Sequence, residues 1–354
     1  MARSLSSMYR HITLSIVIPV FNNTNFVRIM IESILANDFD EWELLAVDDG
    51  SDELTISLLQ SYTNADSRVH LIQRTCTPKG AQTCRNIGME KAQGKYIVFF
   101  DSDDYITPSC LRQRVEAIKL QCDKDFLVFP SGHIVNGTHF AKPYVYSFGY
   151  KTHNSDLTSF FRRELPFVVC NNIYNLESLR KHHLMWDTQL LSMQDAAFNI
   201  SALCKGLSYN YIVCEPDYYY RIDSSPNSIS KKLMTESHRQ SILYYFNKEI
   251  ELVREYYGQR YNRYIYYGML KLSFTLFEKH LDIDYARSLS KVLMQKSRFW
   301  GLLFRYQYEL CNCFHFILPL SLARKFVFFP YLLESLWRNH KQIKRKNKIK
   351  LKTI

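Results

Sequence analysis

The sequence predicts an α/β protein, in which a sheet flanked by helices is followed by a mostly α-helical C-terminal extension. Three observations lead to this prediction. Short apolar runs alternate with amphipathic stretches through the first hundred residues. Polar residues directly follow several of these runs, and ligands of parallel sheets bind at such strand ends. From about residue 236 onward, the chain is rich in tyrosine and has helical periodicity.

The alternation in the first hundred residues favours parallel strands with helices on both faces of the sheet. Each apolar run has the length of a buried strand, and each intervening stretch has the spacing of an amphipathic helix. The expected strands are Leu14–Val20, Glu43–Val47, Val69–Gln73 and Tyr96–Phe100, and the expected helices are Phe26–Leu35, Leu54–Tyr62 and residues 81–92.

Beyond residue 105 the pattern is less regular. Thr107-Pro108 has the form of a helix cap followed by proline, and it predicts a helix that continues to Leu120. Residues 130–175 are rich in Gly, His, Asn and Tyr, and we expect loops and edge strands around a site there. The remaining elements expected before the extension are strands at Phe126–Phe129 and Tyr209–Val213 and helices over 176–183 and 193–205.

The charge is concentrated at the C-terminal end. The chain has 45 Lys and Arg against 34 Asp and Glu, and the stretch 338–354 contains about eight of these bases and no acid. The body of the chain is therefore almost neutral, which argues against nucleic acid as a partner. We expect a catalytic domain over 1–225, a helical and partly amphipathic extension over 226–337 and a basic tail over 338–354.

The cysteines and the N-terminal residues indicate a cytoplasmic protein. The nine cysteines are an odd number at irregular spacings without a CxxC pair, so neither a disulfide framework nor a zinc ribbon is expected. The first apolar run lacks a small-residue cleavage site and is interpreted as a strand rather than a signal peptide.

The segment FFDSDDY places Asp101, Asp103 and Asp104 directly after a strand. Crowded carboxylates repel one another, and a hard divalent cation would relieve that repulsion. Asp101 and Asp103 are two residues apart on extended chain and can point to one side. Mg²⁺ or Mn²⁺ prefers one or two carboxylates and completes its shell with water and phosphate oxygens. The alternative is that these acids cap the following helix or lie solvated in a turn.

Two other phosphate-binding sites are excluded by the residues after the first strand. A dinucleotide-binding turn needs Gly-x-Gly-x-x-Gly there, but the chain has Asn22-Asn23-Thr24. A P-loop needs Gly-Lys-Ser/Thr, which is missing as well.

The runs IVIPVFNN, LLAVDDGSDE and KGAQTCRNIGMEKAQGKYIVFFDSDDY, in this order and spacing, resemble the family 2 glycosyltransferases with the GT-A fold, a Rossmann-like sheet. The resemblance covers roughly residues 12–225. It implies an inverting enzyme that moves a single sugar from a nucleotide-diphospho-sugar, with UDP-sugar expected, to a hydroxyl of a glycan or lipid-linked acceptor in surface polysaccharide biosynthesis.

The resemblance also implies roles for residues at the strand ends. The acids of the FFDSDDY segment would hold the ribose and a Mn²⁺ or Mg²⁺ ion on the diphosphate, with Asp101 in both roles and Asp103 on the metal. Asp104 has no assigned role. The residues implied to bind the rest of the nucleotide-sugar are Pro19, Phe21, Asp48 and Asp49.

Three further residues receive roles by resemblance, each with a structural alternative. Arg85, in a stretch similar to A-R-N-x-G, would bind phosphate oxygens, or it would form a surface salt bridge. Asp195, after Gln194 where the family often has Glu, would be the catalytic base, or it would only interact with the helix dipole. Arg221 would reach the leaving diphosphate from a mobile loop, or it would pack on aromatic neighbours.

The end of the chain indicates contact with a membrane surface. The apolar stretches Leu310–Ala323 and Phe326–Leu333 are each shorter than a membrane span. With the basic tail they are expected to lie on an anionic membrane, which would make the protein peripheral on the inner face of the cell membrane. The alternative is a small helical subdomain with a solvated tail.

Two rival functions remain open. The chain could be a non-catalytic scaffold that binds nucleotide-sugars at the membrane. It could also be a nucleotidylyltransferase, although such enzymes typically carry a Gly-rich loop after the first strand.

Overall fold

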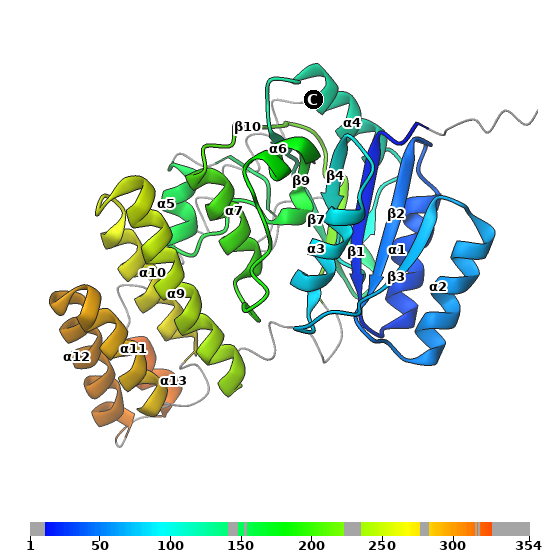
Figure 1. The fold of residues 1–354 in the computed structure, drawn as a ribbon. Coiled ribbons are helices and arrows are strands. Elements are labelled where there is room, and N and C mark those ends of the chain that lie inside the picture. Colours follow the sequence, from blue (N-terminus) through cyan, green and yellow to red (C-terminus); the bar gives the residue numbers. More distant parts are fainter. Residues whose placement is uncertain are drawn as a thin grey trace, which may run out of the picture.

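The computed structural model describes residues 11–140, 148–151, 154–222, 235–276, 283–315, 317 and 319–327. A large sheet with helices on both faces lies beside a group of helices from the C-terminal part of the chain (Figure 1). The helices before that group are α1 (Thr24–Leu35), α2 (Glu53–Ala65), α3 (Ala81–Lys91), α4 (Cys110–Leu120), α5 (Asp156–Phe161), the 3₁₀ turn η1 (Val169–Asn171), α6 (Leu176–Lys181) and α7 (Gln194–Cys204).

The large sheet has the strand order β10-β6-β9-β4-β1-β2-β3. Strand β1 runs parallel to both β2 and β4, and Val20 at its end lies opposite Asp48. The strands and helices expected in the first hundred residues are confirmed to within three residues at each end. The seven strands are β1 (Leu14–Val20), β2 (Trp42–Asp48), β3 (Val69–Gln73), β4 (Tyr96–Phe99), β6 (Phe126–Val128), β9 (Asn172–Asn175) and β10 (Tyr209–Tyr211).

Strand β9 corrects one expectation from the sequence. It was expected among loops and edge strands, but it lies in the middle of the large sheet and pairs antiparallel with both β4 and β6. Two of its polar side chains, Asn172 and Tyr174, form hydrogen bonds inside the protein. Asn172 Nδ2 donates to Tyr174 Oη at 2.6 Å, and Tyr174 Oη donates to Asn199 Oδ1 at 3.2 Å. A polar strand can be central when its buried groups find such partners.

Alternating side chains of the large sheet form two cores. Val17, Val47 and Phe99 belong to a cluster with α3, α7 and the C-terminal helices. Ile16 and Val98, on the opposite face, pack with α1, α2 and α4. This is the result of the two-residue period of extended chain.

Close contact between α3 and the sheet depends on a glycine. A Cβ atom at Gly88 would lie 2.3 Å from a methyl carbon of Val17 in β1. Larger residues at this position would therefore push α3 away from the strand ends. This close approach explains why the last residue of the A-R-N-x-G-like stretch is a glycine.

A smaller sheet extends the edge at which the acidic segment lies. Its order is β5-β11-β7-β8, and β11 pairs antiparallel with β5 and parallel with β7. Because β5 follows the acidic segment directly, the residues of β11 lie beside that segment although they are more than a hundred positions away. The strands are β5 (Tyr105–Ile106), β7 (Ser131–Val135), β8 (Thr138–Phe140) and β11 (Tyr218–Arg221).

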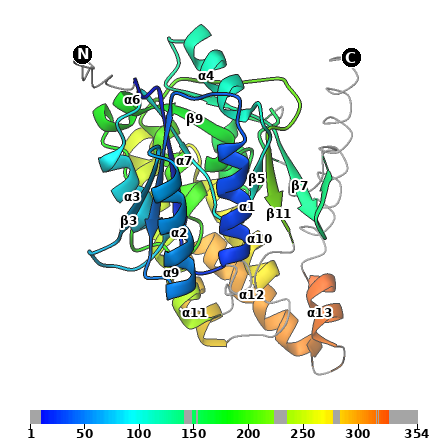
Figure 2. The ribbon, with the colours of Figure 1, turned by 90° about the vertical axis from the view of Figure 1, so that its right-hand side faces the viewer.

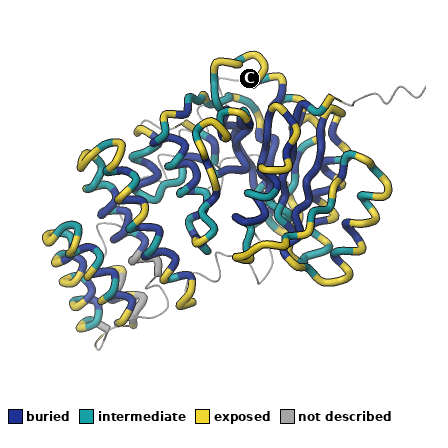
Figure 3. The backbone as a smooth tube through the Cα atoms, viewed as in Figure 1, coloured by how far each residue is buried: buried dark blue, intermediate teal, exposed yellow. Residues whose placement is uncertain are grey.

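The helical extension begins at α9 and packs against the sheet-containing part of the chain, with α9 against α7 and α10 against α5 (Figures 1 and 2). Figure 3 shows that α9 turns a buried side toward α7, whereas α12 is exposed along much of its length. No helix in the described part of the chain is long and apolar enough to cross a membrane. The expected boundary at 225 and the basic tail lie outside the described residues. The helices are α9 (Glu236–Tyr257), α10 (Asn262–Leu276), α11 (Ile283–Lys296), α12 (Arg298–His315) and α13 (Leu320–Val327).

Candidate functional site

The loops after β1 and β2 are tied together at the carboxyl edge of the sheet. Asn22 donates its backbone N–H to Ser51 Oγ at 2.8 Å, and the Asn22 side chain accepts from the backbone N–H of Asp52 at 2.8 Å. Asn22 has a positive φ of 56°, which asparagine tolerates better than most residues. Pro19 lies on β1 opposite Val47, two residues before Phe21. The Asn-Asn-Thr stretch thus forms a turn that is held by hydrogen bonds, at the position where a dinucleotide-binding fold has glycines.

Asp48 and Asp49 are both buried and both already accept hydrogen bonds from the protein. The Asp48 carboxylate accepts from the backbone N–H groups of Gly50 at 2.9 Å and Ser51 at 3.1 Å, so it shapes the turn after β2. Asp49 accepts from Arg74 Nε at 2.5 Å and from the Gly80 N–H at 3.1 Å. Asp49 therefore joins β2 to the loop that precedes α3.

Phe21 presents an aromatic ring at this edge. It is 46% exposed, which is high for a phenylalanine, and the Lys79 ammonium lies 3.4 Å from its ring centroid. An exposed planar ring beside a cation suits a nucleobase, which can stack on the ring. The expected position of Phe21 at the nucleotide side is thus compatible with its surroundings.

The three acids of FFDSDDY separate into a buried one and two nearer the surface. Asp104 is buried, and its carboxylate accepts a short hydrogen bond from the Tyr218 hydroxyl and another from the Arg221 N–H at 2.7 Å. Burial raises the pKa of Asp104 well above its usual value, and the neighbouring Asp103 and Asp101 raise it further. Asp104 therefore joins the acidic segment to β11, a larger role than capping a turn.

Asp101 is paired with Arg85. The two side chains meet at 2.5 Å, and Asp101 keeps 33% of its side-chain surface exposed. Arg85 does form a salt bridge, as the alternative expected, but it is 5% exposed, so the expected place of this salt bridge at the surface is wrong. Burial lowers the pKa of Arg85, but the nearby Asp101 and Asp195 carboxylates outweigh it and raise the pKa overall. The Cys170 thiol lies 3.6 Å from the second Asp101 oxygen.

Arg85 also connects the acidic segment to the beginning of α7. Its Nη1 donates to Gln194 Oε1 at 3.1 Å, and its guanidinium lies 4.5 Å from the ring centroid of Trp186. Gln194, where the sequence suggests only a lost carboxylate, thus holds a phosphate-binding candidate in place. Neither this contact nor that of Trp186 has a local signal in the sequence, because both join segments about a hundred residues apart.

Asp195 lies in the first turn of α7, beside this assembly. Its Oδ1 accepts from the Val169 N–H at 3.3 Å. Burial raises the pKa of Asp195, and the Arg85 cation opposes part of that rise. A carboxylate with a raised pKa is a stronger base, so the electrostatics suit proton abstraction. The structure therefore brings Asp101, Arg85 and Asp195 together from three distant segments.

Arg221 is the last residue of β11 rather than part of a loop. Its Nε donates to the Asp103 carbonyl oxygen at 2.7 Å, and its guanidinium lies 4.5 Å from the Phe26 ring centroid. The contact with Phe26 agrees with the alternative that Arg221 packs on aromatic neighbours. That alternative also places Arg221 on an edge strand, whereas β11 is an inner strand of the smaller sheet. Arg221 positions the backbone of Asp103, and its contact with a diphosphate stays a prediction.

A metal ion at this edge of the sheet would depend on the carboxylates of the acidic segment. Among the residues that the structure describes, no group of three or more His, Cys, Asp and Glu side chains is arranged to hold a metal ion. Asp104 is turned inward, which leaves Asp101 and Asp103 as the carboxylates of the segment nearer the surface. Two carboxylates are compatible with Mg²⁺ or Mn²⁺ when a substrate supplies further oxygens.

Comparison with known proteins finds a family match for the part of the chain that contains the acidic segment. The family model described as glycosyl transferase family 2 matches residues 15–182. Over these residues, which are slightly less than half of the chain, the sequence matches glycosyl transferase family 2. The match covers β1 to β4, the acidic segment and Arg85, and it ends before α7.

Curated relatives match parts of the chain. An uncharacterized glycosyltransferase of Haemophilus influenzae is 39% identical over 102 residues, which are 29% of this chain and 40% of that protein. The putative glycosyltransferase EpsH of Bacillus subtilis is 24% identical over 213 residues, 60% of this chain and 61% of EpsH. The poly(ribitol-phosphate) β-glucosyltransferase of Bacillus spizizenii is 25% identical over 211 residues, 59% of this chain and 32% of that protein. The chain thus spans less than two thirds of the length of these relatives.

Solved structures show the fold over nearly the whole chain. The crystal structure of Staphylococcus aureus TarS residues 1–349 in complex with UDP-GlcNAc superposes with a TM-score of 0.67 at 17% identity, covering 91% of this chain and 92% of that one. The part of the chain that contains the two sheets therefore has the GT-A fold, as the resemblance implies, and the likeness includes the helical C-terminal region.

Proposed function

We propose that this protein is an inverting glycosyltransferase that moves one sugar from a UDP-sugar to a hydroxyl of a glycan or lipid-linked acceptor in surface polysaccharide biosynthesis. The observation that carries the proposal is the assembly of Asp101, Arg85 and Asp195 at the carboxyl edge of the sheet, in a chain of this family. UDP is the nucleotide of choice because TarS was crystallised with UDP-GlcNAc. The curated relatives that act on poly(ribitol-phosphate) support a surface glycan as acceptor.

The proposed reaction needs one base and one cationic group at the leaving diphosphate. Asp195 removes the proton of the acceptor hydroxyl while the hydroxyl oxygen forms a bond to the anomeric carbon. The bond between that carbon and the diphosphate oxygen breaks on the opposite face, and the nucleoside diphosphate leaves with the electron pair. Arg85 is always charged and its planar fork suits phosphate oxygens. It is held at the sheet edge by Asp101 and Gln194.

A divalent cation is part of the proposal. Mg²⁺ or Mn²⁺ held by Asp101 and Asp103 would supply positive charge to the leaving diphosphate. Replacing Asp103 by Ala should then weaken UDP binding in the presence of Mn²⁺ and leave binding in chelator unchanged. Calorimetry that finds equal losses with and without Mn²⁺ would show that Asp103 acts without the cation.

The function is tested by a panel of nucleotide-sugars. Full-length protein is incubated with each donor and either Mg²⁺ or Mn²⁺, and thermal stabilisation and nucleoside diphosphate release are both measured. We expect at least one UDP-sugar to raise Tm and to be slowly hydrolysed. Stabilisation without release of UDP, also with glycan acceptors present, would favour the non-catalytic scaffold instead.

We also propose that the extension holds the protein on an anionic membrane. Phe299, Leu302 and Tyr306 are 68%, 49% and 63% exposed, and their spacing places them on one side of α12. Arg298 and Arg305 are exposed on the same helix. An amphipathic helix with aromatic and basic residues is typical of proteins that lie in the membrane interface. The basic tail adds about 1 kcal/mol for each Lys or Arg near the surface.

Flotation with anionic liposomes tests this attachment. Phe299→Glu and deletion of 338–354 should each release protein from the vesicles. Leu54→Glu is the matched control, because Leu54 is 69% exposed on α2 outside the extension. Equal binding of all these variants and the wild type would contradict the attachment.

A further inference from the structure

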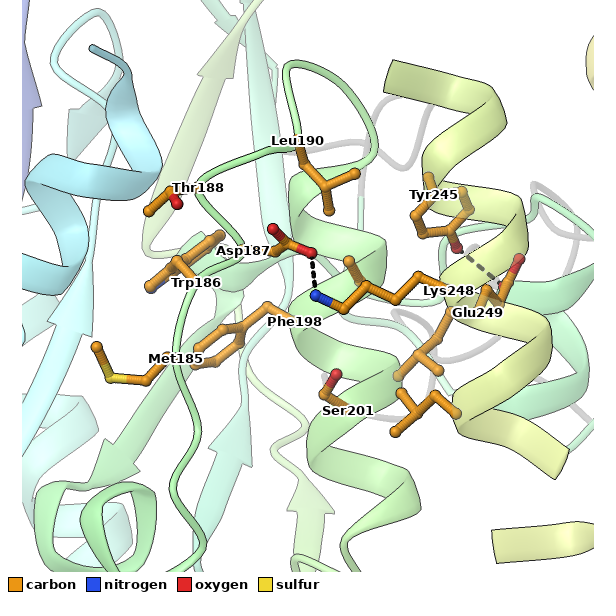
Figure 4. A pocket seen from close by; sticks show the side chains of 13 residues that line it. Met185, Trp186, Asp187, Thr188, Leu190, Phe198, Ser201, Tyr245, Lys248 and Glu249 are labelled. Atoms are coloured by element: carbon orange, nitrogen blue, oxygen red, sulfur yellow. Dashed lines mark hydrogen bonds and ion pairs between the residues drawn. The ribbon is translucent and has the colours of Figure 1, made fainter. Parts of the chain in front are cut away.

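A cavity of about 350 Å³ lies under the loop that leads into α7 (Figure 4). The loop 185–190, α7 and α9 enclose it, so it lies where the extension meets the catalytic part. Its volume is within the range of binding sites for small molecules. Aliphatic side chains form much of its wall, namely those of Met185, Leu190, Ala197, Ile200 and Leu252.

The aromatic residues of the cavity are already packed face to face with other groups. Trp186 stacks on Phe198 with ring centroids 4.4 Å apart, and the Arg85 guanidinium lies 4.5 Å from the Trp186 centroid. Tyr245 has the Arg163 guanidinium 4.8 Å from its centroid. A sugar ring packs its C–H groups on an open aromatic face, whereas each of these rings already has another ring or a guanidinium within 4.8 Å of its centroid. The lining therefore suits an aliphatic group better than a sugar ring.

The charged residues at the cavity are paired within the protein. Asp187 Oδ2 accepts from Lys248 Nζ at 2.5 Å, as the dashed line in Figure 4 shows, and from Tyr244 Oη at 3.1 Å. Glu249 is bound by Arg163 at 2.6 Å and by the Tyr245 hydroxyl at 2.9 Å. A ligand would therefore gain mainly apolar contacts in the cavity. The exposed side chain of Lys248 is part of the cavity lining.

The cavity wall continues into the candidate active site. Phe198 follows Asp195 by three residues, so the two side chains lie one helical turn apart on the same side of α7. Asn86, next to Arg85, exchanges two hydrogen bonds of 2.9 Å with the backbone of Trp186. A molecule in the cavity would therefore contact Trp186, which packs on Arg85, and Phe198, which lies on the same helix as Asp195.

We propose that this cavity binds the aliphatic chain of a ligand whose polar head lies toward the beginning of α7. The inference rests on the proposed function, because a lipid-linked acceptor would bring such a chain to Asp195. The chain could belong to the carrier of the acceptor or to a membrane lipid. Both sources have the same chemistry, an extended hydrocarbon with an anionic head.

Calorimetry with butyl, hexyl and octyl phosphate tests the cavity in the full-length protein without donor. Each buried methylene contributes about fourfold in affinity, so octyl phosphate should bind more than tenfold more tightly than butyl phosphate. Ala197→Phe fills the cavity and should remove this dependence on chain length. Ala117→Phe, at another half-buried alanine but on α4, should keep it. Retention of tight octyl phosphate binding in Ala197→Phe would overturn the proposal.

Two further arms separate the sources of the signal. Phe299→Glu should leave octyl phosphate binding unchanged, and a loss there would assign binding to α12 instead. Farnesyl phosphate that binds more tightly than a straight chain of equal length indicates an isoprenoid carrier, whereas the reverse order indicates a membrane lipid. Because no donor is present, a failure of sugar transfer does not affect the result. Transfer without any dependence of binding on chain length would overturn the cavity proposal alone.

Discussion

The sheet edge and the junction between α7 and α9 solve the burial of charge in different ways. At the sheet edge, backbone N–H groups of nearby turns satisfy Asp48, and the ion pairs Asp49–Arg74 and Asp101–Arg85 join side chains only 25 and 16 residues apart. At the junction, charged side chains from distant segments satisfy one another, as Arg163 and Glu249 do. The first arrangement follows from strand ends in sequence order. The second arrangement depends on tertiary packing. It joins the extension to the sheet-containing part of the chain, and no local pattern in the sequence predicts it.

The largest effect on stability is expected from Arg114→Met. Arg114 is fully buried and donates to Asp217 through Nε at 2.8 Å and Nη2 at 2.7 Å, and to the Cys170 carbonyl at 2.8 Å. Its removal leaves Asp217 buried and unpaired, which costs about 3–5 kcal/mol. Denaturant unfolding measures this loss. UDP affinity should fall as well, because Cys170 adjoins Asp101. A loss below 1 kcal/mol would mean that water reaches Asp217.

Glu249→Ala makes the same kind of change at the junction. We expect a loss of about 3 kcal/mol in the free energy of unfolding, at the lower end of the range, because the Tyr245 hydroxyl stays 2.7 Å from Arg163. UDP affinity should stay within twofold of wild type, in contrast to Arg114→Met. If UDP binding falls in parallel with stability in both variants, the two regions are not energetically separate.

Arg85→Lys tests the link between the two regions. A single ammonium cannot replace the fork that contacts both Asp101 and Gln194. The expected loss of stability is about 1.5 kcal/mol, since a hydrogen bond to a charged group is lost and Asp101 is partly solvated. UDP binding should weaken although the charge is kept. Gln194→Leu is the control, because it removes the same contact and leaves the guanidinium. Wild-type UDP affinity in Arg85→Lys would contradict a role in binding phosphate.

Asp104→Asn should change the pH dependence of the free energy of unfolding more than it changes the magnitude of that free energy. Burial raises the pKa of Asp104 in the folded protein, so the folded state holds its proton to higher pH than the unfolded state does. The wild-type acid thus favours folding below about pH 4 and loses that contribution as pH rises through the raised pKa. The free energy of unfolding of wild type minus that of the variant should fall as the pH rises above 4. A flat difference would contradict the raised pKa.

The same contrast explains what the sequence could predict. The strands β1 to β4 were predictable because each is an apolar run with polar residues at its end, and Asp101 and Asp195 could be located by family motifs. Asp104 could not be interpreted, because Tyr218 and Arg221 are 114 and 117 residues away. The central place of β9 was missed for a related reason. Its asparagines indicate a loop, until the structure shows Asn172 donating to Tyr174 and Asn199.

Gln194 shows how a departure from a motif can be misinterpreted. In the sequence it is only the absence of a second acid before Asp195. In the structure its amide oxygen accepts a hydrogen bond from Arg85, so the residue before the proposed base contacts the phosphate-binding candidate. The single-acid motif is therefore consistent with Asp195 acting alone as base.

The most direct test of the central claim is the transfer rate of Asp195→Asn. The claim is that Asp195 is the base and that Arg85 and Asp101 bind the donor independently of it. The account predicts a loss in kcat of about 10²–10⁴-fold, the usual contribution of a positioned base, with UDP affinity by calorimetry unchanged. The wild-type rate should fall as the pH drops below the raised pKa of Asp195. A variant that transfers sugar at the wild-type rate would contradict the account.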